Sequence, residues 1–225
     1  MRLFIIVCVS LLAISCSKKQ ESTEVSEPSI TPENMVAVLD TIWRTEQEPI
    51  SIRDSLIDIH GAESDEAEVY QKIYRENHVV NMEKVRTILD TYGWPESSLI
   101  GEQGVRTICN VIQHDNQETR ELYIPMMKQA VLDNKLEARW LVRAQDRLAT
   151  DKGELQIYGG QMKYYPETKS FNVWPVYDPE NIDERRAEIG LEPIAQFLKN
   201  RFDFEWDLEE QIQRTEDFKK GINRD

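Results

Sequence analysis

The sequence predicts a mainly α-helical, multi-helix domain with a small antiparallel β-hairpin late in the chain. From residue 33 to residue 150, apolar side chains recur at steps of three and four residues, which gathers them on one face of a helix. From residue 155 to residue 177 the pattern resembles that of strands, with alternation and an aromatic run. No internal repeat is present, which argues against a repeat architecture.

The first two helices follow from capping signals and apolar spacing. Pro32 followed by Glu33 indicates a helix start, and the apolar residues that follow are Met35, Val38, Leu39 and Ile42. A second helix is expected over 64–90, with Ser64 as its N-cap. Its expected apolar face consists of Val69, Ile73, Val80 and Ile88. Gly93 and Pro95 end this helix, because proline cannot continue it.

Three more helices are expected before the hairpin, over 102–113, 118–132 and 136–150. In the first of these, Cys109 shares a stripe with Val105, Ile108 and Ile112, so we expect it to be buried. Pro125 is expected to interrupt and kink the next helix, since it lacks the backbone N–H.

The hairpin is expected to pair 155–165 with 170–177 through a turn at 166–169. Two short helices should follow, one starting at Asp178-Pro179 and ended by Gly190, the other over 193–199. The last expected element is a charged amphipathic helix over 206–219.

Residues 1–15 are expected to form a secretion signal peptide. Arg2 provides a positive start, and the apolar run over 3–14 is too short to span a bilayer stably. The run leads into Cys16 through a segment that resembles the bacterial lipobox, with Ala13 at the usual leucine position. The resemblance implies cleavage before Cys16, lipidation of that cysteine and a membrane anchor in the cell envelope. The alternative is an ordinary signal peptide with an incidental cysteine.

The remaining chain divides by composition. Residues 16–32 are expected to be the lipidated cysteine and a flexible tether, because only Val25 and Ile30 in this stretch are sizeable apolar groups. Residues 33–201 are the expected helical domain with its hairpin, and 202–225 the charged C-terminal helix. The body is expected in the periplasm.

Charge and cysteine content exclude several classes of partner. The formal charge is −14, and it becomes −15 once Arg2 is removed with the signal. Without a basic run, this acidity argues against nucleic acid as a partner. After loss of Cys8 and acylation of Cys16, only Cys109 remains, so neither an intramolecular disulfide nor a thiolate metal cluster can form. No zinc, EF-hand or phosphate-loop spacing is present, and we expect no metal or cofactor.

Four polar segments together resemble a family of bacterial proteins known only as a domain of unknown function. They are Gly93-Trp94-Pro95, Gln113-His114, Asp146-Arg147 with 153–161, and 178–191. The family pattern runs GWP, QHAD, DR with GxxQxYGTQ, and DPxxVDxRRxxxGL, and the likeness covers about 35–198. The resemblance implies no activity, but it marks these polar residues as the family's signature.

The sequence departs from this pattern at three places. Asp115-Asn116 replaces Ala-Asp, Gly160 replaces Thr, and Ile182 replaces Val. The acid therefore follows His114 directly instead of two residues later, which weakens any role for that carboxylate.

The signature residues are our candidates for a site. His114 is the candidate catalytic residue, because its pKa suits acid/base work near neutral pH; the alternative is a structural histidine stabilised at a helix C-terminus. Arg147 offers a guanidinium fork for carboxylate or phosphate, or an ion pair within the fold. The candidate binding residues are Gln113, Asp146, Arg147, Gln156, Tyr158 and Gln161. Gln156 and Tyr158 either line a pocket or serve the core.

Two functional hypotheses follow. The first is an envelope lipoprotein that acts as a binding or interaction module for a small ligand or an envelope protein. The second is a hydrolase or transferase with His114 as acid/base and with Arg147, Gln156 and Tyr158 orienting the substrate. Fold class alone cannot choose between them.

Overall fold

The structure is a computed structural model that describes residues 29–166 and 169–222. The predicted signal peptide, Cys16, most of the predicted tether and two residues of the predicted hairpin turn lie outside the described residues. The helices of the described part are α1 (Met35–His60), α2 (Asp65–Tyr92), α3 (Ser97–His114), α4 (Gln117–Leu132), α5 (Ala138–Asp151), α6 (Ile182–Glu188), α7 (Ile194–Phe202) and α8 (Leu208–Ile222). The short 3-10 helix η1 (Pro179–Asn181) directly precedes α6.

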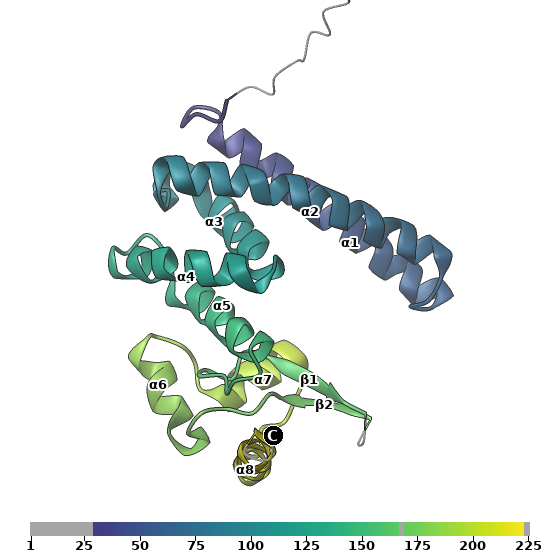
Figure 1. The fold of residues 1–225 in the computed structure, drawn as a ribbon, viewed down its shortest axis with the longest axis vertical. Helices are drawn as coiled ribbons and strands as arrows, with labels where there is room; N and C mark the ends of the chain where they lie inside the picture. The colour runs from purple at the N-terminus through teal and green to yellow at the C-terminus, as the bar shows by residue number, and fades with distance from the viewer. Residues whose placement is uncertain (1–28, 167–168, 223–225) are drawn as a thin grey trace, which may run out of the picture.

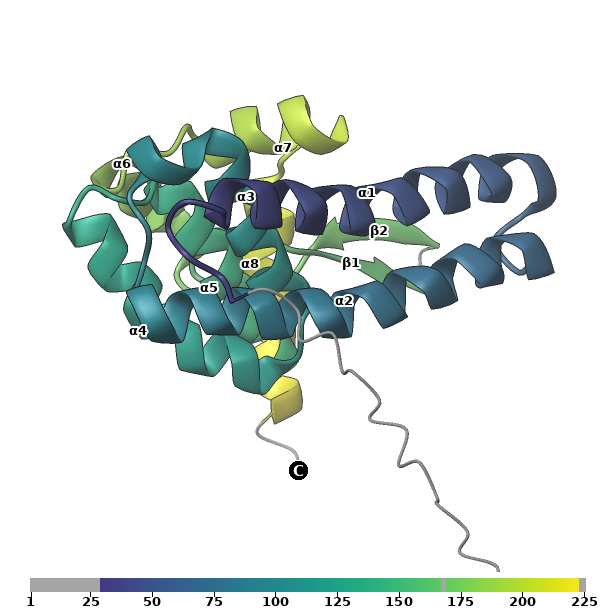
Figure 2. The same cartoon turned by 90° about the horizontal axis from the view of Figure 1, so that it is seen from above.

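The predicted fold class, mainly α with a late antiparallel hairpin, is confirmed. Strand β1 (Met162–Tyr165) pairs antiparallel with β2 (Ser170–Val173), with Met162 opposite Val173. The long helices α1 and α2 lie side by side, α3 packs against both, and α4 packs against α5. The hairpin and α6, α7 and α8 lie together on the side of α5 that faces away from α1 and α2 (Figure 1), and Figure 2 shows the α1–α2 pair extending to one side of the molecule.

Two hydrophobic clusters correspond to these two regions. The larger one joins α1 to α5 and contains buried side chains such as Ile42, Val85, Ile108 and Met127. The smaller cluster lies under the hairpin and α6 and α7, and consists of Val173, Val176, Ile182, Ile194 and Leu198. Burial of these apolar surfaces is the main favourable term in folding. Helix α5 contributes Trp140 and Ala144 to the larger cluster, and its Asp146 bonds to the loop at 157–160 that precedes the hairpin.

Helix α2 begins as predicted, but its buried face differs. The Ser64 side chain accepts a hydrogen bond from the Ala67 N–H and caps the helix. Val69, Ile73 and Val80 are exposed, so the predicted apolar face is wrong except for Ile88. The residues of α2 that are buried instead are Ala67, His78, Asn81, Met82, Val85, Ile88 and Leu89. Polar contacts with α1 explain why His78 and Asn81 take interior positions.

The predicted interruption at Pro125 is wrong, because α4 is helical from Gln117 to Leu132. The carbonyl that loses its N–H partner belongs to Glu121, which is exposed, so water can satisfy it. The break in the helical region lies in α3 at Gly101, where φ is 67° and ψ is 173°. Glycine adopts such a conformation without a steric penalty.

The predicted strands are longer than the observed ones. Residues 155–161 lie outside β1, and Gln156 makes only an isolated bridge with Val176. The backbone N–H groups of Ile157, Tyr158 and Gly160 bond to a side chain of α5, so they cannot join a strand ladder. No helix among the described residues has the length and apolar character needed to cross a membrane.

Candidate functional site

Asp146 of α5 organises the loop that carries the signature glycines. Its carboxylate is fully buried and accepts hydrogen bonds from Ile157 N–H at 2.9 Å, Tyr158 N–H at 3.0 Å and Gly160 N–H at 2.8 Å. Burial raises the pKa of Asp146, and these three donors oppose that rise. The carboxylate is therefore committed to the fold, and it does not face a ligand.

Gln156 is also committed to the fold. Its side chain is fully buried, and Nε2 donates to the Gln161 carbonyl at 3.0 Å and to the Trp174 carbonyl at 2.7 Å. Its Oε1 accepts from the Gln161 N–H at 2.8 Å. The Gln156 side chain is therefore bonded to the backbone of Gln161 and holds the loop between them together. This agrees with the interpretation that Gln156 serves the core and does not line a pocket.

Tyr158 and the neighbouring Gly159 tie this loop to α6 and α7. The Tyr158 carbonyl accepts a 2.6 Å hydrogen bond from Arg186. Gly159 has a φ of 77°, and a Cβ there would lie 2.7 Å from Cδ1 of Ile194. Only glycine fits this position without a shift of its neighbours.

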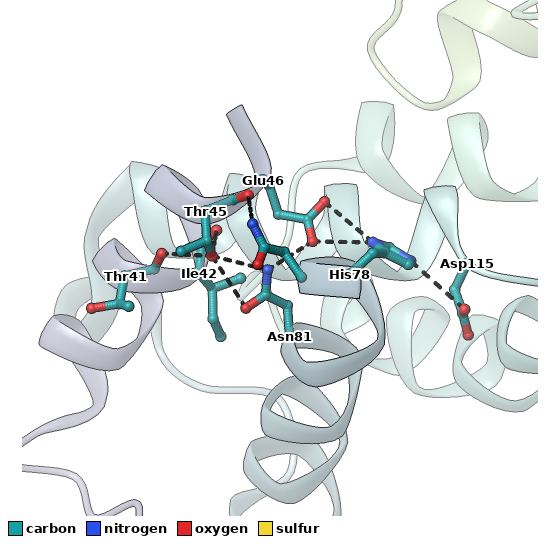
Figure 3. A network of polar contacts seen from close by, with 8 residues as sticks. Thr41, Ile42, Thr45, Glu46, His78, Asn81 and Asp115 are labelled. Carbon is teal, nitrogen blue, oxygen red and sulfur yellow. Dashed lines mark hydrogen bonds and ion pairs between the residues drawn. The ribbon is translucent and has the colours of Figure 1, made fainter. Parts of the chain in front are cut away.

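The other predicted residues lie on a different part of α5. The charges of Arg147 of α5 and His78 of α2 both act on His114 at the end of α3, so both side chains lie near it. We call this group the junction cluster; its residues are Glu46, Tyr74, His78, His114, Asp115 and Arg147. It joins the α1–α2 pair to the ends of α3 and α5, and Figure 3 shows three of its members.

His78 is the buried centre of the junction cluster. Its Nδ1 lies 3.1 and 3.2 Å from the two Glu46 carboxylate oxygens, and its Nε2 lies 3.6 Å from Oδ1 of Asp115 (Figure 3). Asn81 donates a 2.9 Å hydrogen bond to Glu46. Burial lowers the pKa of His78, but the hydrogen bond and charge of Glu46 and the charge of Asp115 outweigh it, so the pKa lies above its usual value.

His114 has the opposite electrostatic environment. Part of its ring is packed against the protein, although the side chain still reaches solvent. This burial, followed by the positive charges of Arg147 and His78, lowers the pKa of His114 to about 4. His114 is therefore a neutral imidazole at neutral pH.

Arg147 is half-buried, and its Nε has no hydrogen-bond partner among the described residues. The Nε of the nearby Arg120 also lacks a partner, but the terminal nitrogens of Arg120 form an ion pair with Asp151 and donate to the Gln113 carbonyl at 2.8 Å. Burial and the charge of Arg120 lower the pKa of Arg147, yet a guanidinium stays protonated at any physiological pH. Arg147 is thus a charged donor with unused hydrogen-bonding capacity.

Comparison with known protein families identifies the family to which the chain belongs. The model of DUF6624, a family of unknown function, matches residues 42–205. The chain belongs to this family. No curated protein and no solved structure matches the chain. The matched range contains both the loop around Asp146 and the junction cluster.

In the DUF6624 domain, His114 and Arg147 therefore lie in one cluster. Asp146 and Gln156 lie outside that cluster, and their side chains are used to hold the loop at 156–161. Gln113 contributes its backbone carbonyl to Arg120, and Gln161 its backbone to Gln156. Sequence reasoning missed Glu46 and His78. The available signal was a polar residue at a core position, since Glu46 follows Ile42 by one helical turn.

The junction cluster of the DUF6624 domain suits recognition of a small anion. Burial and the charge and hydrogen bond of Glu46 raise the pKa of Tyr74 to about 12, so its phenol is neutral and adds no negative charge to the cluster. Arg147 supplies a fixed positive fork, which matches a carboxylate or phosphate. No group of three or more potential metal ligands occurs in the described part of the chain.

Proposed function

We propose that this protein is a membrane-anchored envelope lipoprotein whose junction cluster binds a small anionic ligand. The observation that carries the proposal is the half-buried Arg147 guanidinium, whose Nε lacks a hydrogen-bond partner among the described residues. An unpaired buried charge is costly, and proteins retain such groups mainly where a ligand or a mechanism uses them. A carboxylate or phosphate oxygen would complete this donor.

A catalytic role for the same cluster is the second candidate. His114 is neutral and reaches solvent, so it can act as a base at neutral pH, but a pKa of about 4 makes it a weaker base than a free imidazole and leaves no proton for general acid catalysis, contrary to our expectation of a pKa near neutrality. Arg147 would orient an anionic substrate of a hydrolase or transferase. Gln156 no longer supports this version, because its amide is fully used by Gln161 and Trp174. Binding alone needs fewer assumptions, and we favour it.

The anchor rests on Cys16, the cysteine at the end of the lipobox-like segment. Acylation there would hold the body at the membrane, with the helical domain in the periplasm. Two or more acyl chains give stable anchoring, whereas one holds weakly. Replacing Cys16 by serine should move the protein from the membrane fraction to the soluble fraction. Retention of Cys16→Ser in washed membranes would refute the anchor.

The ligand site is tested by calorimetric titration of the mature protein with orthophosphate and with acetate. We expect saturable binding of at least one of these probes. Arg147→Gln should weaken it by about tenfold, which is roughly the 1.4 kcal/mol of one charge-assisted contact. Arg75→Gln is the matched control, because Arg75 is exposed on α2 and pairs with Glu68. Equal weakening by both variants, or no binding at all, would refute the site.

Enzyme activity and binding can be separated with His114→Gln. If the cluster only binds, this variant keeps most of the affinity for the anion, because Arg147 remains. If His114 is an acid or base, the variant loses turnover of phosphate or carboxylate esters while binding persists.

A further inference from the structure

A groove with a volume of about 1210 Å³ lies between the helical bundle and the segment that contains α6 and α7. Residues from α1, α3 and α5 line one side of it, and residues 189–192 with α7 line the other. The volume is above the usual range for small-molecule sites. A ligand that fills much of this groove is therefore larger than a single phosphate or acetate.

Arginines dominate the lining. We call this feature the arginine groove; its arginines are Arg106, Arg139, Arg143, Arg186 and Arg201. With Lys135 there are six basic side chains against three acidic ones, in a chain whose formal charge is −14. Positive charge is thus concentrated here against the trend of the whole molecule, and a charged cleft attracts ligands of the opposite sign.

Three of these arginines lack a carboxylate partner in the described part of the chain: Arg106, Arg143 and Arg201. Arg139, in contrast, pairs with Glu137 at 2.8 Å. Burial and the positive charges of Arg201, Arg139 and Arg106 lower the pKa of Arg143. The arginines are therefore close enough to repel one another, and their repulsion disfavours the empty groove.

Aromatic rings position these guanidinium groups. Cζ of Arg106 lies 4.8 Å from the centroid of the Trp43 ring, and Cζ of Arg143 lies 5.0 Å from that of Trp140. A ring attracts the cation but accepts little from its N–H groups. The donors consequently remain available to an anion.

The loop that Asp146 holds builds one wall of the groove. Gly160, held by Asp146, is part of the lining, and a Cβ at Gly160 would lie 3.1 Å from Oδ2 of Asp146. Arg186 is buried, and it donates to the carbonyls of Tyr158 and Glu192 at 2.6 and 2.7 Å. Asp146 and Arg186 therefore shape the wall, and the three unpaired arginines supply the donors.

We propose that the arginine groove is a second binding site, distinct from the junction cluster, and that its ligand is an oligophosphate. The ligand must place several negative charges close together to neutralise neighbouring arginines. Linked phosphates do so, because each carries at least one charge and the oxygens fit the guanidinium fork. Such a ligand is either a free chain or the head group of a lipid diphosphate.

Isothermal titration of the mature protein with sodium tripolyphosphate tests the proposal, with orthophosphate and citrate as comparison probes. Tripolyphosphate should bind saturably to the groove and at least tenfold more tightly than either comparison probe. Its affinity should fall as salt is raised, because ion pairs are screened. Absence of saturable binding, or equal binding of citrate, would overturn the oligophosphate assignment.

Two groove variants and two controls locate the binding. Arg143→Gln and Arg201→Gln should each weaken tripolyphosphate binding by about tenfold, the usual scale for one lost charge-assisted contact. Arg201 is exposed, so its variant tests the groove even if Arg143→Gln folds poorly. Arg75→Gln and Lys72→Gln, which change two exposed residues of α2 outside the groove, should leave the affinity within twofold. Loss of affinity in the controls equal to that in the groove variants would overturn the location.

The source of the phosphate is distinguished by flotation of the non-acylated Cys16→Ser protein with phosphatidylcholine vesicles. The vesicles are prepared with and without a polyprenyl diphosphate. Flotation only with the diphosphate lipid, lost in Arg201→Gln, identifies a lipid-borne ligand. Binding of tripolyphosphate without flotation identifies a free ligand. If both the flotation and the titration give no binding that depends on Arg201, the proposal is wrong.

Discussion

Asp146 and Arg147 are neighbours in sequence on α5, yet their side chains differ in hydrogen bonding: that of Asp146 has protein partners, and the Nε of Arg147 has none among the described residues. The Asp146 carboxylate is buried with three backbone donors around it. The Arg147 guanidinium is half-buried and has an Nε without a partner among the described residues. Successive residues of a helix point about 100° apart, so one step along α5 separates the loop from the junction cluster.

This difference separates scaffold from site. A buried polar group whose partners all belong to the protein holds a loop in place, and removing it leaves those partners unsatisfied. A buried donor without a partner does little for the fold and is available to a ligand. The comparison predicts that mutations in the two regions affect different measurements.

The largest effect is expected for Asp146→Ala. The substitution leaves three buried N–H groups without an acceptor, and each costs about 1–3 kcal/mol. We expect a loss of at least about 3 kcal/mol in the free energy of unfolding, measured by urea denaturation. Asp217→Ala, on the exposed surface of α8, is the control and should change stability by less than about 0.5 kcal/mol. A small loss for Asp146→Ala would mean that the loop does not depend on it.

Stability should also depend on pH through His78. Its pKa is raised in the folded protein, so the stabilisation is fully present below the unfolded value of about 6.5 and is lost as pH rises through the folded pKa. Urea denaturation should show the free energy of unfolding declining between pH 6 and pH 9. His78→Gln should flatten this limb of the curve. A curve of unchanged shape in His78→Gln would contradict the ion pair with Glu46.

Cys109 provides a test of the bundle core that involves neither region. It is 1% exposed, and burial raises the pKa of its thiol above the usual range. A thiol reagent should therefore modify the native protein far more slowly than the urea-denatured protein. Fast modification under native conditions would show that α3 opens readily.

The sequence allowed the fold class, the Ser64 cap and the buried Cys109 to be predicted, because each depends on local spacing. The apolar face of α2 was not predictable in the same way. Apolar periodicity favoured Val69, Ile73 and Val80, but the interior face of α2 includes the polar residues His78 and Asn81. Their partners lie on α1, and Glu46 and His78 are 32 positions apart in the sequence. A single sequence does not reveal such pairs.

Only part of the candidate site was predictable, because a single sequence does not show which polar residues have partners within the fold. The polar signature identified His114 and Arg147, which lie in one cluster, and also Asp146 and Gln156, which do not. All four have the composition of binding residues, and only the hydrogen bonds distinguish them. The arginine groove could not be predicted, because Arg106, Arg143 and Arg201 come from three separate helices.

A smaller effect on stability is expected for Arg147→Gln, in contrast to its neighbour. The arginine makes no hydrogen bond through Nε that the fold would lose, and its removal relieves the desolvation of a partly buried charge and its repulsion by Arg120, which Asp151 offsets only in part. We expect the free energy of unfolding to stay within about 0.5 kcal/mol of the parent protein, or to rise. A loss comparable to that of Asp146→Ala would place Arg147 in the scaffold and remove the basis of the proposed site.

The most direct measurement is the ¹⁵N–¹H resonance of Arg147 Nε during titration with orthophosphate and acetate. Arg147→Lys identifies the resonance by its disappearance. Binding at the junction cluster predicts a saturable shift of this resonance with at least one probe, because Nε gains an acceptor, while the Nε resonance of the exposed Arg75 stays nearly constant. A resonance of Arg147 that does not move, or that moves no more than that of Arg75, would contradict the account.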